Sequence, residues 1–154
     1  MPENTYRRDL MGHVTLSPSG SISAGAWTSL TFVYTAGLFG IDDLGGLKLA
    51  MRTHNDMTPL QTSDPSAPGY LTAVASNGAP LEVDVSFKRN VRPWGNCVTI
   101  LAKRFLSEGD TITLVLGDTS KGSKGVRAQT FVEEPQPYRL SVDAFATCDF
   151  IPLP

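Results

Sequence analysis

The sequence predicts a single all-β domain over residues 1–154, an antiparallel β-sandwich of about nine or ten short strands with a jelly-roll-like or immunoglobulin-like arrangement. Glycine and proline recur roughly every eight to twelve residues, which is the spacing of turns in all-β domains. Between these turns, apolar and polar residues alternate with a period of two, so each segment has one face for the core and one for water. Helical periodicity is scarce, and the alternation favours antiparallel pairing.

Four segments carry the clearest strand signal. Residues 81–88, 111–116 and 138–143 alternate between apolar and polar positions, and residues 27–35 are rich in β-branched and aromatic side chains. The weaker strand candidates are 13–17, 47–53, 70–75, 97–103, 126–132 and 147–151.

Two segments are open to another interpretation. Residues 41–51 are compatible with a turn of helix, although Gly45 and Gly46 argue against it. Residues 1–12 are a candidate for a disordered N-terminal arm of the domain.

Composition excludes several classes of protein. The net charge is −2 and the isoelectric point is near 5.6, so nothing attracts the whole chain to nucleic acid or to an anionic membrane. The first residues lack the apolar segment of a signal peptide, and no apolar run approaches the ~18 residues of a membrane span. We therefore expect a soluble, cytoplasmic protein with neither nucleic acid nor a membrane as partner.

The two cysteines, Cys97 and Cys148, are far apart and lack the CxxC spacing of metal and redox motifs. We interpret them as buried, reduced thiols, with a disulfide between them as the alternative.

Two long polar loops interrupt the strand pattern, at 53–69 and 117–125. The second, GDTSKGSKG, invites comparison with a phosphate-binding loop, but its residue order is wrong and a strand follows it instead of a helix. We interpret it as a solvated loop between strands, in which the ammonium groups of Lys121 and Lys124 are candidates for weak anion binding.

Candidate catalytic and metal-binding residues are few. His54 and Asp56 in the first loop could contribute to a metal site, but a zinc centre needs three or four ligands and the chain has two histidines. Asp42 and Asp43, before Leu-Gly-Gly, are better explained as turn residues. No spacing indicates a nucleophile with its base, so we predict no catalytic residue, no metal site and no cofactor.

The segment 87–94 carries the most distinctive surface chemistry. Arg92 has a planar guanidinium suited to carboxylates or phosphates, and Trp94 has a ring suited to stacking on a sugar. The alternative is structural: Trp94 closes one end of the sandwich and Arg92 pairs with an acid. Lys88, Arg89 and Pro93 resemble the residues that protect sheet edges, which favours a monomer.

Five stretches in order resemble the N-terminal β-rich region of the bacterial family called Domain of Unknown Function 3604. They are YTAGLFGIDDLGGLKLAMR (34–52), VASNGAPLEV (74–83), KRNVRPWGNCVTI (88–100), EGDTITLVLGDTSKGSKGVRAQTF (108–131) and VDAFATCDFIPLP (142–154). The resemblance implies that such a β-module precedes a metal-dependent hydrolase segment rich in histidine, no part of which is matched here. The catalytic residues of the family therefore map to no position of this chain.

The sequence leaves three functional hypotheses. The first is a non-catalytic β-sandwich module, accessory to or scaffolding a hydrolase domain that is linked to it or separate. The second is a stand-alone carbohydrate-binding module that uses Trp94 and Arg92, with a carbohydrate or an anionic small molecule as ligand. The third is a small metal-dependent hydrolase with its site near His54 and Asp56.

Overall fold

The computed structural model describes most of the chain. The described residues are 10–17, 25–51, 60–86, 96–127, 138–143 and 151–152. Within these ranges there is no α-helix, and every pairing between strands is antiparallel. The all-β, antiparallel class predicted from the sequence is confirmed.

The described ranges contain eleven strands, three of them only two residues long. They are β1 (Gly12–Ser17), β2 (Trp27–Thr28), β3 (Leu30–Ala36), β4 (Gly46–Met51), β5 (Leu71–Ala75), β6 (Leu81–Ser86), β7 (Asn96–Ala102), β8 (Thr111–Leu116), β9 (Val126–Arg127), β10 (Tyr138–Asp143) and β11 (Ile151–Pro152). Each segment expected to form a strand contains all or part of one of them.

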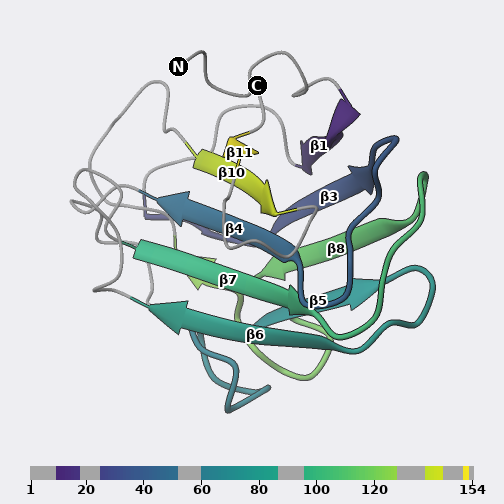
Figure 1. Ribbon diagram of the computed structural model, residues 1–154. Coiled ribbons are helices and arrows are strands. Elements are labelled where there is room, and N and C mark those ends of the chain that lie inside the picture. Colours follow the sequence, from purple (N-terminus) through teal and green to yellow (C-terminus); the bar gives the residue numbers. More distant parts are fainter. Residues whose placement is uncertain are drawn as a thin grey trace.

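The strands form two main sheets and one short pair. One sheet has the order β1-β3-β8-β5, the other has the order β11-β10-β4-β7-β6, and β2 pairs with β9. The two main sheets lie as two layers, one behind the other (Figure 1). Neighbours in a sheet are often far apart in the sequence, which is typical of sheets that exchange strands between layers.

The facing sides of the two layers share one hydrophobic core. In the first sheet, alternate positions of β3 and β8 point inward, and Ile112, Leu114 and Leu116 are almost fully buried. In the second sheet, inward positions of β4 and β7 such as Leu49 and Ile100 belong to the same cluster. Full burial of one such side chain contributes about 1.5–3 kcal/mol, so this cluster is the main source of stability.

The outer side of the five-stranded sheet departs from simple alternation. Ala50, Cys97, Ser141 and Asp143 occupy outward positions, yet each is buried. Burial raises the pKa of the Cys97 thiol, which is a free cysteine in the structure, as expected for a buried reduced thiol. Cys148 lies outside the described residues.

Residues at the inner boundary of the expected N-terminal arm are part of the fold, and residues 1–9 lie outside the described residues. Gly12 begins β1, and Met11 is 2% exposed. The Met11 carbonyl accepts a hydrogen bond from the Tyr34 hydroxyl, whose pKa is raised by burial. Met11 and Gly12 therefore belong to the folded domain.

The alternative of a helical turn at 41–51 is wrong. The segment turns at Asp43 and Leu44 and then enters β4. A side chain at Gly46 would collide with the carbonyl oxygen of Ile100 on β7, so the strand pairing itself requires glycine there. In the part of the chain described here, no helix has the length and apolarity needed to cross a membrane.

Candidate functional site

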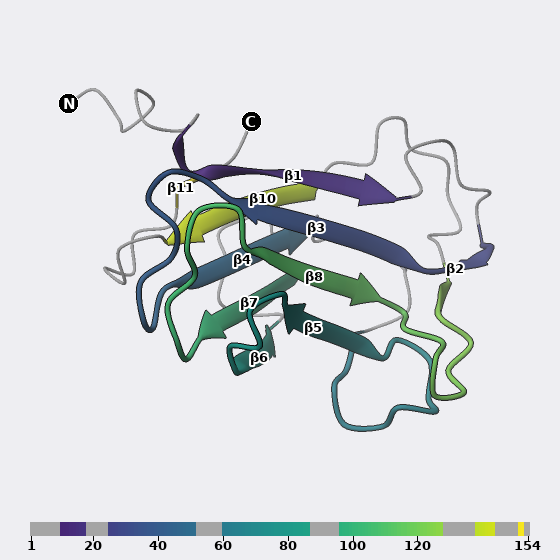
Figure 2. The ribbon, with the colours of Figure 1, turned by 90° about the vertical axis from the view of Figure 1, so that its right-hand side faces the viewer.

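The loops of the molecule gather at the two opposite ends of strands β3 and β8 (Figure 2). We call one the Trp27 end; it consists of β2, β9 and the loops 60–70 and 117–125. We call the other the Phe105 end; it consists of the loops 37–45, 76–80 and 103–110. A six-residue strand such as β8 separates them by about 20 Å.

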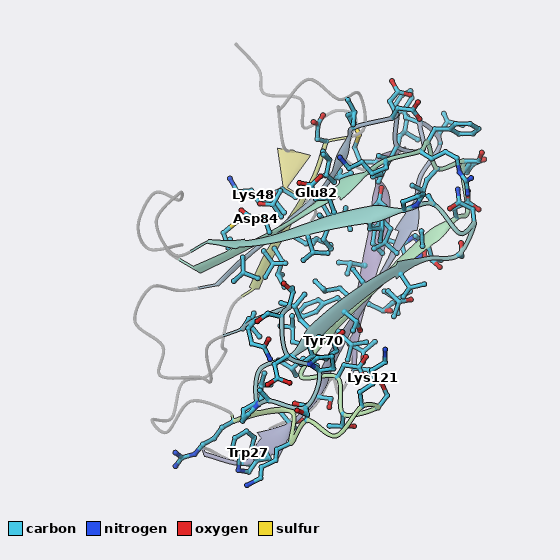
Figure 3. The ribbon with its side chains drawn as sticks, turned by 90° about the horizontal axis from the view of Figure 1, so that it is seen from below. Trp27, Lys48, Tyr70, Glu82, Asp84 and Lys121 are labelled. Carbon is cyan, nitrogen blue, oxygen red and sulfur yellow. The ribbon has the colours of Figure 1, made fainter. Side chains whose placement is uncertain are left out.

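Trp27 lies at the Trp27 end (Figure 3), with 46% of its surface exposed. It stands opposite Arg127 in the β2–β9 pair, while the neighbouring pair holds the fully buried Val126. The Lys124 Nζ lies 5.9 Å from the centroid of the indole. This distance is near the ~6 Å limit of a cation–π contact, and at an exposed site such a contact contributes about 0.5–1 kcal/mol.

The loop 117–125 is held in shape by its own glycines and a buried serine. Gly117 and Gly125 both have positive φ, and a side chain at either would collide with backbone, of Val126 and Thr28 respectively. The buried Ser123 hydroxyl accepts a hydrogen bond from the Gly125 N–H, at 3.1 Å. The loop leads into β9, as expected for a connection between strands and unlike a phosphate-binding loop.

The loop carboxylate of Asp118 is used locally. It accepts hydrogen bonds from the Ser120 N–H at 2.9 Å and from the Thr72 hydroxyl at 2.8 Å. Hydrogen bonds from Ser120 hold the pKa of Asp118 below its ordinary value, and the Thr72 hydroxyl and the Lys121 charge make smaller contributions. Its negative charge is thus directed into the loop.

The neighbouring loop 60–70 is organised by one glutamine. The Gln61 side-chain oxygen accepts hydrogen bonds from the N–H groups of Ser63 and Asp64, each at 2.8 Å. The Asp64 carboxylate in turn accepts from Ser66, which lowers the Asp64 pKa. The two loops are joined by backbone hydrogen bonds, including one from the Gly69 N–H to the Gly125 carbonyl at 3.0 Å. Together they form one continuous platform beside Trp27.

The Phe105 end is held together by backbone pairing between its loops and by side chains that bond to loop backbone. Ile41 and Leu106 exchange two hydrogen bonds of 2.8–2.9 Å, and both side chains are buried. The Asn77 amide donates to the Phe105 carbonyl at 3.1 Å, and Arg104 donates to the Asn77 carbonyl at 3.0 Å.

This end exposes an unusual amount of apolar surface. Six large apolar side chains of the described residues are exposed, and four belong to these loops: Leu38 (57%), Phe39 (37%), Leu44 (56%) and Phe105 (57%). The carboxylates of Asp42, Asp43 and Glu108 are exposed on the same loops. The end therefore combines apolar surface with negative charge.

Leu44 is exceptional in two respects. It is the one described residue other than glycine with a positive φ, at 67°, a conformation that costs an L-residue about 1–2 kcal/mol. Its side chain also projects mainly into water. The adjacent Gly45 and Gly46 cannot relieve it, because each is needed where the chain passes close to the backbone of another strand.

A third group of charges lies on the outer face of the five-stranded sheet and is linked to the Phe105 end by Lys103. Figure 3 shows Lys48, Glu82 and Asp84 together there. Glu82 forms an exposed ion pair of 2.6 Å with Lys103, a type of contact that contributes about 0–1 kcal/mol. We interpret this group as a solvated sheet face.

The structure places some of the predicted site residues and not others. Lys121 and Lys124 are exposed, as expected of a solvated loop, and neither makes a close ion pair with a described carboxylate. Arg92 and Trp94 lie outside the described residues, and so do the His54 and Asp56 of the hydrolase hypothesis.

Trp27 was not predicted as a site residue. The available signal was the alternation of its own strand segment: Leu30, Phe32 and Tyr34 face inward, so the odd positions beginning with Trp27 face outward.

No group of three or more metal-ligating side chains comes together within the described ranges. Comparison with models of known protein families gives no match to the chain, and no curated protein matches it significantly.

Proposed function

We propose that this chain is a non-catalytic β-sandwich module that acts as an accessory or scaffolding part of a larger metal-dependent hydrolase. The observation that carries the proposal is the Phe105 end, where Leu38, Leu44 and Phe105 are each more than half exposed. Burial of one such side chain against a partner contributes about 1.5–3 kcal/mol, a gain that the isolated chain forgoes.

The conformation of Leu44 supports a role in docking. Local stability favours glycine or asparagine at a positive φ, and solvent exposure favours a polar side chain. Leucine satisfies neither preference. Departures from local preference of this kind concentrate at functional positions, where an interaction outside the domain compensates for them.

The proposed occupant of the Phe105 end is the hydrolase domain, with a docking surface that is basic around an apolar recess. Its positive charge would complement the exposed Asp42, Asp43 and Glu108. The resemblance to the Domain of Unknown Function 3604 family supports a hydrolase as the partner, and the stretch 34–52 that contributes to this resemblance contains Leu38 and Leu44.

The first experiment is to read the gene beyond the codon for Pro154 and to express the whole product. We expect a histidine-rich hydrolase segment in that product, or in a neighbouring gene whose product is then co-expressed. Hydrogen exchange at residues 37–45 and 103–110 is then compared between the isolated chain and the complex. We expect slower exchange in the complex at this end and unchanged exchange at residues 117–125.

Two variants test the surface itself. Leu44→Asn combined with Phe105→Ser is expected to abolish the added protection while the isolated module stays folded. Val74→Thr is the control, because Val74 is exposed on β5 outside this end. Protection that persists in the double variant would rule out docking through the Phe105 end.

The non-catalytic part of the proposal has its own test. The isolated chain is screened for ester, phosphoester and glycoside hydrolysis, with and without divalent metal ions. We expect no turnover above background. Turnover that a single substitution in this chain abolishes would refute the proposal.

A further inference from the structure

We infer that the Trp27 end binds an acidic carbohydrate, with a sugar ring stacked on the Trp27 indole and its anionic group held by Lys124. This site is independent of the docking surface proposed above, because the two lie at opposite ends of strands β3 and β8 (Figure 2). The inference combines an exposed aromatic ring, a cation that makes no close ion pair with a described carboxylate, and a preformed platform of loops.

The indole is the first of these observations. Nearly half of the Trp27 surface is in contact with water although the residue begins a paired strand. An exposed indole presents a flat apolar face, and the C–H face of a pyranose is a matching flat apolar surface whose burial removes both from water. Trp27 therefore supplies the stacking surface that a saccharide needs.

The cation is the second observation. Lys124 lies over the indole at the outer limit of a cation–π contact, so this weak contact is readily exchanged for a stronger one. A carboxylate or sulfate beside the ring would form a charge-assisted hydrogen bond with the same ammonium group. Lys121 is exposed on the same loop but lies apart from the indole (Figure 3), and its charge acts on Asp118. The Asp118 and Asp64 carboxylates accept hydrogen bonds within their own loops, and neither forms a close ion pair with Lys124.

The platform is the third observation. The β2–β9 pair fixes Trp27, and the glycines and Ser123 of the loop 117–125 fix the segment that carries Lys121 and Lys124. Hydrogen bonds from Gly69 and to Tyr70 connect this segment to the neighbouring loop. A site that is ordered before binding loses less conformational entropy when the ligand arrives.

The charge distribution favours a short acidic saccharide over a nucleic acid. A nucleic-acid strand is bound along an extended basic groove with several stacking side chains. This chain has a net charge of −2, and the Phe105 end carries exposed carboxylates. At the Trp27 end, the Lys124 cation lies beside a single aromatic ring, which suits a ligand of a few sugar units.

The test is a calorimetric titration of the full chain with four probes of similar length. They are an oligogalacturonate, which carries carboxylates; a sulfated oligosaccharide; a neutral malto-oligosaccharide; and a thymidine oligonucleotide. We expect the oligogalacturonate or the sulfated oligosaccharide to bind at least about tenfold more tightly than the other two. The two acidic probes show which anionic group is preferred.

Variants connect the binding to the site. Trp27→Ala is expected to weaken binding of the preferred probe by about tenfold or more, and Trp27→Phe to restore much of it. Lys124→Gln is expected to remove most of the preference for the acidic over the neutral probe. The matched controls at the other end of the molecule, Phe105→Ala and Lys103→Gln, should bind as the unmodified chain does, and circular dichroism checks that each variant is folded.

Four outcomes would overturn the inference: no binding of either acidic probe at millimolar concentration, equal affinity for acidic and neutral probes, oligonucleotide binding as tight as that of the acidic saccharides, or unchanged affinity in folded Trp27→Ala. None of them bears on docking through the Phe105 end, whose test uses different residues and a different partner.

Discussion

The two ends of the molecule join the same strands in different ways. At the Trp27 end, side chains such as Gln61, Asp118 and Ser123 satisfy the backbone of the loops. At the Phe105 end, several of the principal bonds run between the backbones of different loops, as between Ile41 and Leu106. Backbone groups must be paired at both ends. At the Trp27 end, this pairing uses the Asp64 and Asp118 side chains of the loops 60–70 and 117–125.

The two ends also differ in surface chemistry. At the Trp27 end, Asp64 and Asp118 accept hydrogen bonds from their own loops, and an indole and two lysines face the solvent. At the Phe105 end, Asp42 and Asp43 are exposed beside apolar side chains. The two ends therefore offer different surfaces to a ligand.

The largest effect on stability is expected from a side chain added at a crowded glycine of the loop 117–125, beside Trp27. Gly125→Ala adds a Cβ that would collide with the Thr28 carbonyl oxygen, at a residue whose φ is 97°. We expect a loss of about 3 kcal/mol in the free energy of unfolding, measured by urea denaturation. Gly109→Ala at the other end is the matched control, because Gly109 also has a positive φ but open space around it. Its expected loss is about 1 kcal/mol, and equal losses at the two sites would show that crowding does not distinguish them.

An intermediate effect of opposite sign is expected at Leu44. Leu44→Gly removes the conformational penalty of the positive φ, and we expect the free energy of unfolding to rise by about 1 kcal/mol. The same urea experiment measures it. Leu38→Gly is the control, since Leu38 is equally exposed but has an ordinary φ, and it should be neutral or destabilising. A destabilised Leu44→Gly variant would mean that the leucine side chain contributes to the fold itself.

The smallest effect is expected from the Asp118 charge. Hydrogen bonds from Ser120 and Thr72 favour the ionised form and lower the pKa of Asp118 in the folded chain. Its stabilisation is therefore complete above the ordinary carboxyl pKa and is lost as the pH falls through the lowered folded value. Asp118→Asn should cost about 0.5–1 kcal/mol at pH 7 and progressively less in acid. The exposed Glu108, replaced by Gln, is the control, and a deficit of Asp118→Asn that is independent of pH would contradict this origin.

The strand pattern could be predicted because burial of apolar side chains selects one face of each strand. In β3 and β8, inward residues such as Phe32 and Leu114 alternate with less buried ones, and this local signal survives in the fold. It failed on the outer face of the five-stranded sheet, where Cys97 and Asp143 are buried. Burial there depends on contacts across the folded chain, which a local period cannot reveal.

The candidate site was only half predictable. Lysines in a glycine-rich loop indicated Lys121 and Lys124, but the ring beside Lys124 comes from Trp27, which only the pairing with Arg127 brings close. The turn near Leu44 was misleading for a related reason. The adjacent glycines suggest where the chain should adopt a positive φ, yet contacts with distant strands use both of them and leave that conformation to the leucine.

The pairing of β4 with β10 has a consequence for biosynthesis. Strand β4 (Gly46–Met51) emerges from the ribosome early, but it lies between β7 and β10 and stays without one neighbour until Tyr138–Asp143 has been translated. During that interval one row of its backbone groups lacks its native partner, a state prone to pairing between chains. The yield of this protein should therefore depend on translation rate and chaperone supply.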